Sequence, residues 1–225
     1  MVGPRWFVGF DSLMELVAFI IALVIAYQAL KGYRLTKQKT LWYVHFSFAV
    51  LSAGLLIDSL AGFLGILAQT LKGTIALTLI GYSLCFLAQL LAYSMLVYAY
   101  VSQRRTLSST SSSTVLASLL GFAMLQAAPA PPIRWLGPLV EYHPVSEIVL
   151  LFLVFYIAVK TSANYSATKD RNAFLVFLAF LLLALSHLFF ILVPVSPLFF
   201  VIGHLLQLSG FVSFLVMLLR VTRYQ

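Results

Sequence analysis

The sequence predicts an all-α, polytopic membrane protein with seven transmembrane helices. Of its 225 residues, 62% are hydrophobic and only 9% are charged, whereas soluble domains are about 45–50% apolar and about 25% charged. The mean hydropathy is +1.04, and the chain contains long apolar stretches near the roughly 20 residues that a helix needs to cross a bilayer. This composition excludes a soluble enzyme, a nucleic-acid-binding domain and a disordered tail.

The predicted spans are separated by polar segments. In chain order they are 9–30, 41–67, 74–101, 114–128, 143–162, 172–193 and 197–219. The fourth is short, follows a serine-rich stretch and ends at Pro129. The sequence alone therefore does not decide whether this span crosses the bilayer fully.

The distribution of Lys and Arg predicts the orientation of the chain. Eleven of the 14 basic residues fall after spans 1, 3 and 5 or in the C-terminal tail, and only Arg5, Lys72 and Arg134 fall on the other side. Because cytoplasmic loops carry the excess of basic residues, we expect the N-terminus outside and the C-terminus in the cytoplasm.

The two ends of the chain resemble each other. A shift of 132 positions aligns Glu15 with Glu147, and it aligns the Tyr-x-x-Thr-Lys segment 33–37 with the segment 165–169. With one span between the copies, both copies enter the membrane from the same side, which predicts a parallel repeat.

A shift of 118 positions extends the match to the third span of each copy, because it aligns Gln89 with Gln207. The domain organisation follows from these two shifts. We expect a three-helix repeat at 1–106, a linker with the short helix at 107–142, and a second repeat at 143–225.

The three-one-three plan resembles that of the SWEET sugar transporters, and seven helices with an outside N-terminus resemble microbial rhodopsins. The signature residues differ, since 197–219 contains no lysine for a retinal Schiff base. Spans 1, 2, 5 and 6 also lack the internal proline of SWEETs, because Pro144 and Pro194 fall at span ends. The repeated turn before an aromatic-rich helix is similar to small polytopic membrane proteins of archaea, a resemblance that implies no activity.

Ionisable residues inside spans are costly, so they mark candidate sites. Five of them are predicted at one depth, roughly 6–12 Å below the outer surface at ~1.5 Å per residue. They are Glu15, Asp58, Glu147, His187 and His204. Gln89 and Gln207 lie nearer the midplane, where they pack across the repeat axis or line a polar route. His45 lies at the cytoplasmic end of span 2, beside Trp42, as expected of an interfacial residue.

Three interpretations of this polar layer remain open. The side chains hold the helices together by hydrogen bonds, or they bind a small solute, a cation or protons in an outward-facing cavity. The third interpretation is a cofactor site, with His187 and His204 as axial ligands of haem b, or with both histidines and Asp58 around a metal ion. No cofactor is predicted, because no metal-binding or haem motif accompanies these residues.

The sequence thus favours a non-enzymatic plasma-membrane protein that binds, and transports, a small solute or cation. No GxSxG motif indicates a hydrolase. The alternatives are a structural or sensory subunit of a larger membrane complex and a b-type electron carrier. The expected partners are the lipid bilayer and either further copies of the chain or other membrane subunits, and no nucleic acid.

Overall fold

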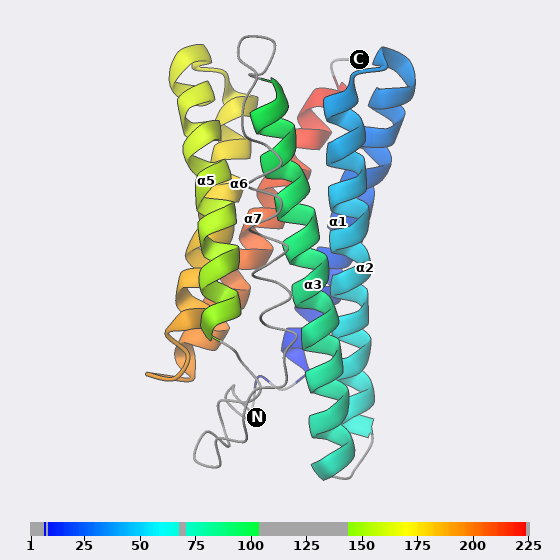
Figure 1. Cartoon of the computed structure of the whole chain (residues 1–225), viewed down its shortest axis with the longest axis vertical. Coiled ribbons are helices and arrows are strands. Elements are labelled where there is room, and N and C mark those ends of the chain that lie inside the picture. Colours follow the sequence, from blue (N-terminus) through cyan, green and yellow to red (C-terminus); the bar gives the residue numbers. More distant parts are fainter. Residues whose placement is uncertain (1–6, 8, 68–70, 104–143, 224–225) are drawn as a thin grey trace.

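A computed structural model of the chain describes residues 7, 9–67, 71–103 and 144–223. These residues form a bundle of helices that lie side by side along its long axis (Figure 1). The helices are α1 (Phe10–Thr36), α2 (Lys39–Leu67), α3 (Leu71–Gln103), α5 (Pro144–Thr168), α6 (Arg171–Ile191) and α7 (Leu198–Arg223). The predicted span 114–128 lies outside the described residues.

The six helices match six of the predicted spans but continue beyond them. The first span was expected to end at residue 30 and the fifth at residue 162, whereas α1 ends at Thr36 and α5 at Thr168. An apolar stretch ends where lipid contact ends, but the backbone hydrogen bonds of a helix continue into water. The helices stop instead where Lys37 and Lys169 adopt left-handed backbone conformations, with φ of 57° and 54°.

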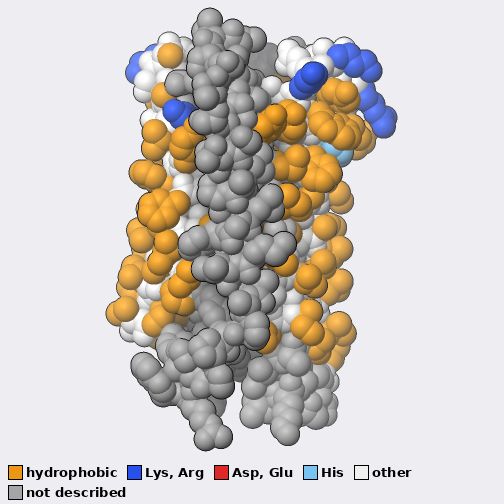
Figure 2. Space-filling model, viewed as in Figure 1, with side chains coloured by type: hydrophobic (Ala, Val, Ile, Leu, Met, Phe, Trp, Pro, Cys, Tyr) orange, Lys and Arg blue, Asp and Glu red, His pale blue; other side chains and the backbone are white. Residues whose placement is uncertain are grey.

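All six helices are long enough and apolar enough to cross a membrane. Their exposed faces carry large apolar side chains, as on α5, where Val145, Ile148, Phe152, Phe155 and Val159 recur at helical spacing. Figure 2 shows such side chains along the visible flanks of the bundle. A surface of this kind is suited to lipid, and it marks the chain as a multi-pass membrane protein.

The helices pack as two triplets. Within each triplet the middle helix, α2 or α6, contacts both of its neighbours, and the triplets meet where α1 contacts α7 and α3 contacts α5. Glycines permit close approach of α2 and α3, since a Cβ at Gly54 would lie 2.5 Å from the Cβ of Ala88. Small residues at helix contacts are the usual means of packing in membranes.

The turns α1–α2 and α5–α6 lie at the same end of the bundle (Figure 1) and have the same geometry. The N–H of Lys37 donates to the carbonyl of Tyr33 at 2.8 Å, and the N–H of Lys169 donates to that of Tyr165 at 2.7 Å. Each lysine also lies over the ring of its tyrosine, with Nζ 5.9 Å and 5.5 Å from the two centroids. The segments 33–37 and 165–169, matched in sequence, therefore also match in conformation.

Candidate functional site

All seven predicted site residues line one small cavity inside the bundle. Every described helix contributes to its wall, and the cavity has a volume of about 30 Å³. The residues in question are Glu15, Asp58, Gln89, Glu147, His187, His204 and Gln207. A volume of this size holds about two water molecules. The shared depth inferred from the sequence thus corresponds to actual proximity.

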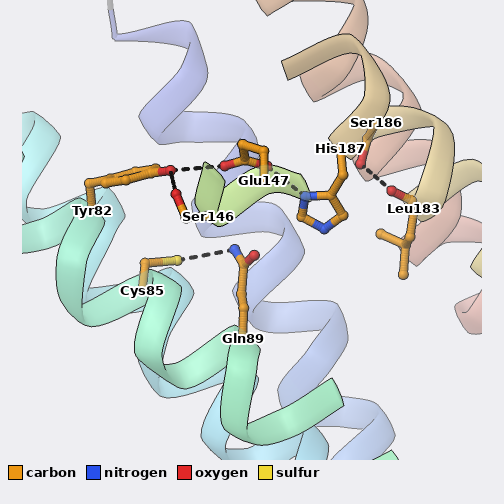
Figure 3. A network of polar contacts seen from close by, with 8 residues as sticks. All are labelled: Tyr82, Cys85, Gln89, Ser146, Glu147, Leu183, Ser186 and His187. Carbon is orange, nitrogen blue, oxygen red and sulfur yellow. Dashed lines mark hydrogen bonds and ion pairs between the residues drawn. The ribbon is translucent and has the colours of Figure 1, made fainter. Parts of the chain in front are cut away.

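One side of the cavity is a continuous hydrogen-bonded network from α3, α5 and α6 (Figure 3). The Tyr82 hydroxyl donates to Glu147 Oε1 at 3.0 Å and lies 2.9 Å from Ser146 Oγ. Glu147 Oε2 lies 2.7 Å from Nδ1 of His187. A hydroxyl carries a single proton, so Tyr82 receives the proton of Ser146, and a carboxylate at Glu147 accepts from both Tyr82 and His187.

Local structure explains why Glu147 points into this network. It lies in the first turn of α5, where backbone N–H groups and the helix dipole stabilise a negative charge. Its neighbour Ser146 is buried as well, and only 4% of Glu147 is exposed. A buried charge of this kind requires partners, and Tyr82 and His187 supply them from the two adjoining helices.

The second nitrogen of His187 has no hydrogen-bond partner in the described structure. The side chain is 1% exposed, and Nε2 points away from Glu147 (Figure 3). Buried polar atoms are nearly always satisfied by protein or water. Because His187 lines a cavity that can hold water, a water or a ligand is the natural partner of this atom.

The opposite side of the cavity, from α1, α2 and α7, is looser. Nε2 of His204 lies 3.7 Å from Glu15 Oε1, too far for a hydrogen bond, while its Nδ1 lies 2.9 Å from the carbonyl oxygen of Phe200. Glu15 and Asp58 contribute their carboxyl groups to this side of the cavity.

The two glutamines were expected either to bond across the repeat axis or to line a polar route, and both line the cavity. The side-chain amide of Gln89 donates to the thiol sulfur of Cys85 at 3.3 Å. Cys85 also lines the cavity and is the single cysteine of the chain. In the sequence it lies inside the apolar span 74–101, which gives no sign of a polar environment.

Tyr82 and Ser146 were also missed from the sequence. The signal for Tyr82 was available, since residues 82, 85, 86 and 89 recur at the spacing of one helix face, and all four line the cavity. Ser146 carried no such signal. His45 was expected at the membrane interface. It lies near the end of the bundle that carries the α1–α2 turn, with Nδ1 2.9 Å from the carbonyl oxygen of Ala26.

The described residues do not assemble the metal set considered above. No three His, Cys, Asp or Glu side chains among them are placed to share a metal ion, so His187, His204 and Asp58 do not converge. The ring of Phe190 lies 6.3 Å from that of His187 and 5.0 Å from that of His204. The Phe190 side chain thus packs against both imidazoles.

Comparison of the chain with protein-family models, curated proteins and solved structures gives no match. The inference of function therefore rests on the cavity and on the residues around it.

Proposed function

We propose that this chain is a seven-helix plasma-membrane protein that binds a small cation in the buried cavity and carries it across the membrane. The observation behind this proposal is the convergence of all seven predicted residues on one enclosed space. Polar side chains within apolar helices are costly. Their gathering at a hydrated cavity, on six different helices, is typical of an ion pathway.

The balance of charge favours a cation as the ligand. The cavity is lined by three carboxyl groups and two imidazoles, and neither Lys nor Arg is among its described lining residues. With neutral histidines, the wall carries an excess of negative charge that attracts cations. An anion would lie against the Glu147 carboxylate without a Lys or Arg among the described residues of the wall.

The size of the cavity favours a small ligand. A space for about two waters accommodates a proton on a water molecule or a dehydrated metal cation, but not a sugar or an amino acid. In this conformation the cavity volume of about 30 Å³ thus narrows the range of small solutes considered from the sequence.

The seventh helix and the orientation belong to the same proposal. α3 ends near the α1–α2 turn, whereas α5 begins at the opposite end of the bundle (Figure 1), an arrangement that supports one further crossing between them. The Lys and Arg side chains visible on described residues gather at the end with the α1–α2 turn (Figure 2). The positive-inside rule makes this end cytoplasmic.

Cysteine labelling tests the orientation. On a Cys85→Ser background, Val195→Cys and Leu35→Cys place thiols on side chains that are 76% and 73% exposed, at opposite ends of the bundle. We expect a membrane-impermeant thiol reagent to label position 195 in intact cells and position 35 only after permeabilisation. The reverse pattern contradicts the orientation.

A duplication of a three-helix unit accounts for the matched turns at 33–37 and 165–169. Their shared left-handed lysine, hydrogen bond and ring contact support it, as does the correspondence between the α1–α7 and α3–α5 contacts. Under a repeat that pairs α1 with α5 and α3 with α7, these two contacts are equivalent.

Ion uptake into liposomes tests the cation-binding function. We expect the purified protein to move at least one of Na⁺, K⁺ and H⁺, and Asp58→Asn and Glu15→Gln to lower that flux. The matched control is Asp170→Asn, which changes the same functional group at the far end, where Asp170 caps α6, and Asn is an equally good cap. Thermal unfolding verifies that each variant is folded. Equal fluxes in all variants contradict the proposal.

Purification in mild detergent tests the alternative of a subunit in a larger complex. If the chain is such a subunit, the same hydrogen bonds, such as that of Tyr82 to Glu147, only hold the helices together. A second polypeptide at stoichiometric amounts supports the alternative, and a lone monomer or homo-oligomer counts against it.

A further inference from the structure

We propose that Nε2 of His187 is the atom that binds the transported cation, and that this cation is the proton. The proposal rests on the cation-binding function above and deepens it by naming the ion and its acceptor. Four observations carry it: the direction of the hydrogen bonds, the unpartnered nitrogen, the charges around it and the size of the cavity.

The network on α3 and α5 defines the state of the imidazole. Ser146 donates to Tyr82 and Tyr82 donates to Glu147 Oε1, so the carboxylate accepts the proton of His187 Nδ1 at its other oxygen. A carboxylate that holds Nδ1–H leaves the lone pair of a neutral imidazole on Nε2. Ser146, Tyr82 and Glu147 thus orient the basic Nε2 of His187, and they are positioning residues for it.

That nitrogen is available. Nε2 is buried and has no partner among the described residues, while its side chain belongs to the cavity wall. The space is large enough for a water molecule beside it. A proton delivered by that water therefore meets an oriented lone pair that no described side chain already occupies.

The groups that face His187 favour a positive charge on it. Its packed neighbours and the other titratable groups around the cavity come from five helices: Glu15 on α1, Asp58 on α2, Tyr82, Cys85 and Tyr93 on α3, Glu147 on α5, and His204 on α7. Carboxyl groups outnumber the one other imidazole. Among the described residues of the wall, the one other group that can be cationic is His204 in its protonated state, which like His187 contacts the ring of Phe190.

The available ligands suit a proton better than a metal cation. Na⁺ requires several oxygen ligands at once, but both oxygens of Glu147 are already engaged by Tyr82 and His187. No three His, Cys, Asp or Glu side chains of the described chain converge as a metal site. A proton needs only one lone pair.

The proton transfer is balanced. A hydronium ion in the cavity gives a proton to the lone pair of Nε2, so one O–H bond breaks, one N–H bond forms and a neutral water remains. The imidazolium is then paired with the Glu147 carboxylate, and the net charge of the pair rises from minus one to zero. Release reverses these steps.

A continuation toward the other end of the bundle begins at Tyr93. Its ring packs edge-on against His187 at 6.0 Å between centroids, and its hydroxyl is buried without a partner in the described structure. Tyr93 lies one turn beyond Gln89 along α3, away from the outer end. It is the next polar group for a proton that leaves His187.

Nitrogen-15 NMR of histidine-labelled protein tests the acceptor directly. The chain has four histidines, and the His187→Asn variant assigns the signals of His187 by their loss. We expect Nδ1 to stay protonated as the buffer is made acidic, while Nε2 changes from an unprotonated to a protonated signal. An Nε2 signal that does not change overturns the proposal.

Proton flux tests its role in transport. Protein is reconstituted into liposomes that contain a pH-sensitive dye, and a potassium gradient with valinomycin drives protons inward. His187→Asn keeps an N–H donor near the position of Nδ1 but has no atom at the position of Nε2. We expect its flux to fall to that of protein-free liposomes, with Tyr93→Phe reduced as well. His45→Asn, the same substitution near the other end, should match the unchanged protein.

The outcomes separate this inference from the proposed function. Proton flux that is unchanged in a folded His187→Asn protein overturns the proton assignment. Sodium uptake that depends on Asp58, without proton movement, also overturns it and leaves the cation site intact. Absence of any ion flux overturns both. Proton flux that is lost in His187→Asn and kept in His45→Asn, with the NMR change at Nε2, supports both.

Discussion

Glu147 and Glu15 lie 132 positions apart and face the same cavity, but their surroundings differ. Glu147 is 4% exposed and bonded to Tyr82 and His187 at 3.0 Å and 2.7 Å. Glu15 lies 3.7 Å from the nearest imidazole nitrogen of His204 and shares the cavity wall with another acid, Asp58. The carboxylate of Glu147 accepts hydrogen bonds from two donors, whereas the carboxyl group of Glu15 has few donors near it.

The two triplets differ at the end of the bundle near the cavity, where Glu15 and Glu147 lie. At the basic end, the turns at 33–37 and 165–169 have the same backbone and ring contacts. Under the duplication that we propose, the scaffold kept its form while the polar residues diverged. The position that matches Tyr82 at a shift of 118 is Phe200, which has no hydroxyl to donate. The position that matches His187 at a shift of 132 is Leu55, so neither donor to Glu147 has a polar counterpart on the Glu15 side.

Removal of each carboxyl group is the strongest test of this contrast. We expect Glu147→Ala to lower the free energy of unfolding by about 3 kcal/mol, because it removes the carboxylate that accepts from Tyr82 and His187 in a buried site. Glu15→Ala should cost about 1 kcal/mol or less, as is usual for a weak interhelical contact in membranes. Thermal or denaturant unfolding in detergent measures both. Equal losses would mean that the two sides are energetically alike.

The ring of Phe190 separates the two sides, and Gly203 makes room for it. A Cβ at position 203 would lie 2.4 Å from Phe190 Cε1, so Gly203→Ala must displace the ring between His187 and His204. We expect a loss of about 2 kcal/mol from overpacking and a shift in the NMR signals of both histidines. In the control Gly32→Ala, the nearest atom is the flexible end of Leu41 at 3.2 Å. A tolerated Gly203→Ala, with unchanged histidine signals, would show that the ring does not hold the sides apart.

Tyr82→Phe makes the Glu147 side resemble the Glu15 side. The substitution keeps the ring but removes the hydroxyl bonds to Glu147 and Ser146, so we expect a loss of about 1 kcal/mol in unfolding free energy. A double-mutant cycle with Glu147→Gln should give non-additive losses, because the two residues share one bond. Additive losses would argue that the bond contributes nothing.

The smallest effects are expected at the matched turns. Lys37→Gly and Lys169→Gly relieve the same left-handed backbone strain, so each should change the unfolding free energy by about 1 kcal/mol or less, in the stabilising direction. The two values should agree, since the turns share their geometry. Opposite signs would break the equivalence of the turns. Pulse proteolysis of the two variants in parallel provides the comparison.

The sequence determined the architecture of this protein because lipid imposes a simple rule on it. Apolar stretches of membrane-spanning length must be helices, since no water satisfies the backbone inside a bilayer. The six described spans were predicted on this ground, and charge and spacing located the polar layer, all seven members of which line the cavity. The helix ends were less predictable, because α1 and α5 end at left-handed lysines rather than where the apolar residues end.

Tertiary structure decided which residues of that layer meet. Depth along a helix follows from counting residues, but rotation about the axis and the choice of neighbouring helix do not. The pairing of Glu147 with His187 and Tyr82, and the longer approach of Glu15 to His204, depend on which helices adjoin in the bundle. The unpartnered nitrogen of His187, and the contact of the Phe190 ring with both imidazoles, exist only once the six helices pack together.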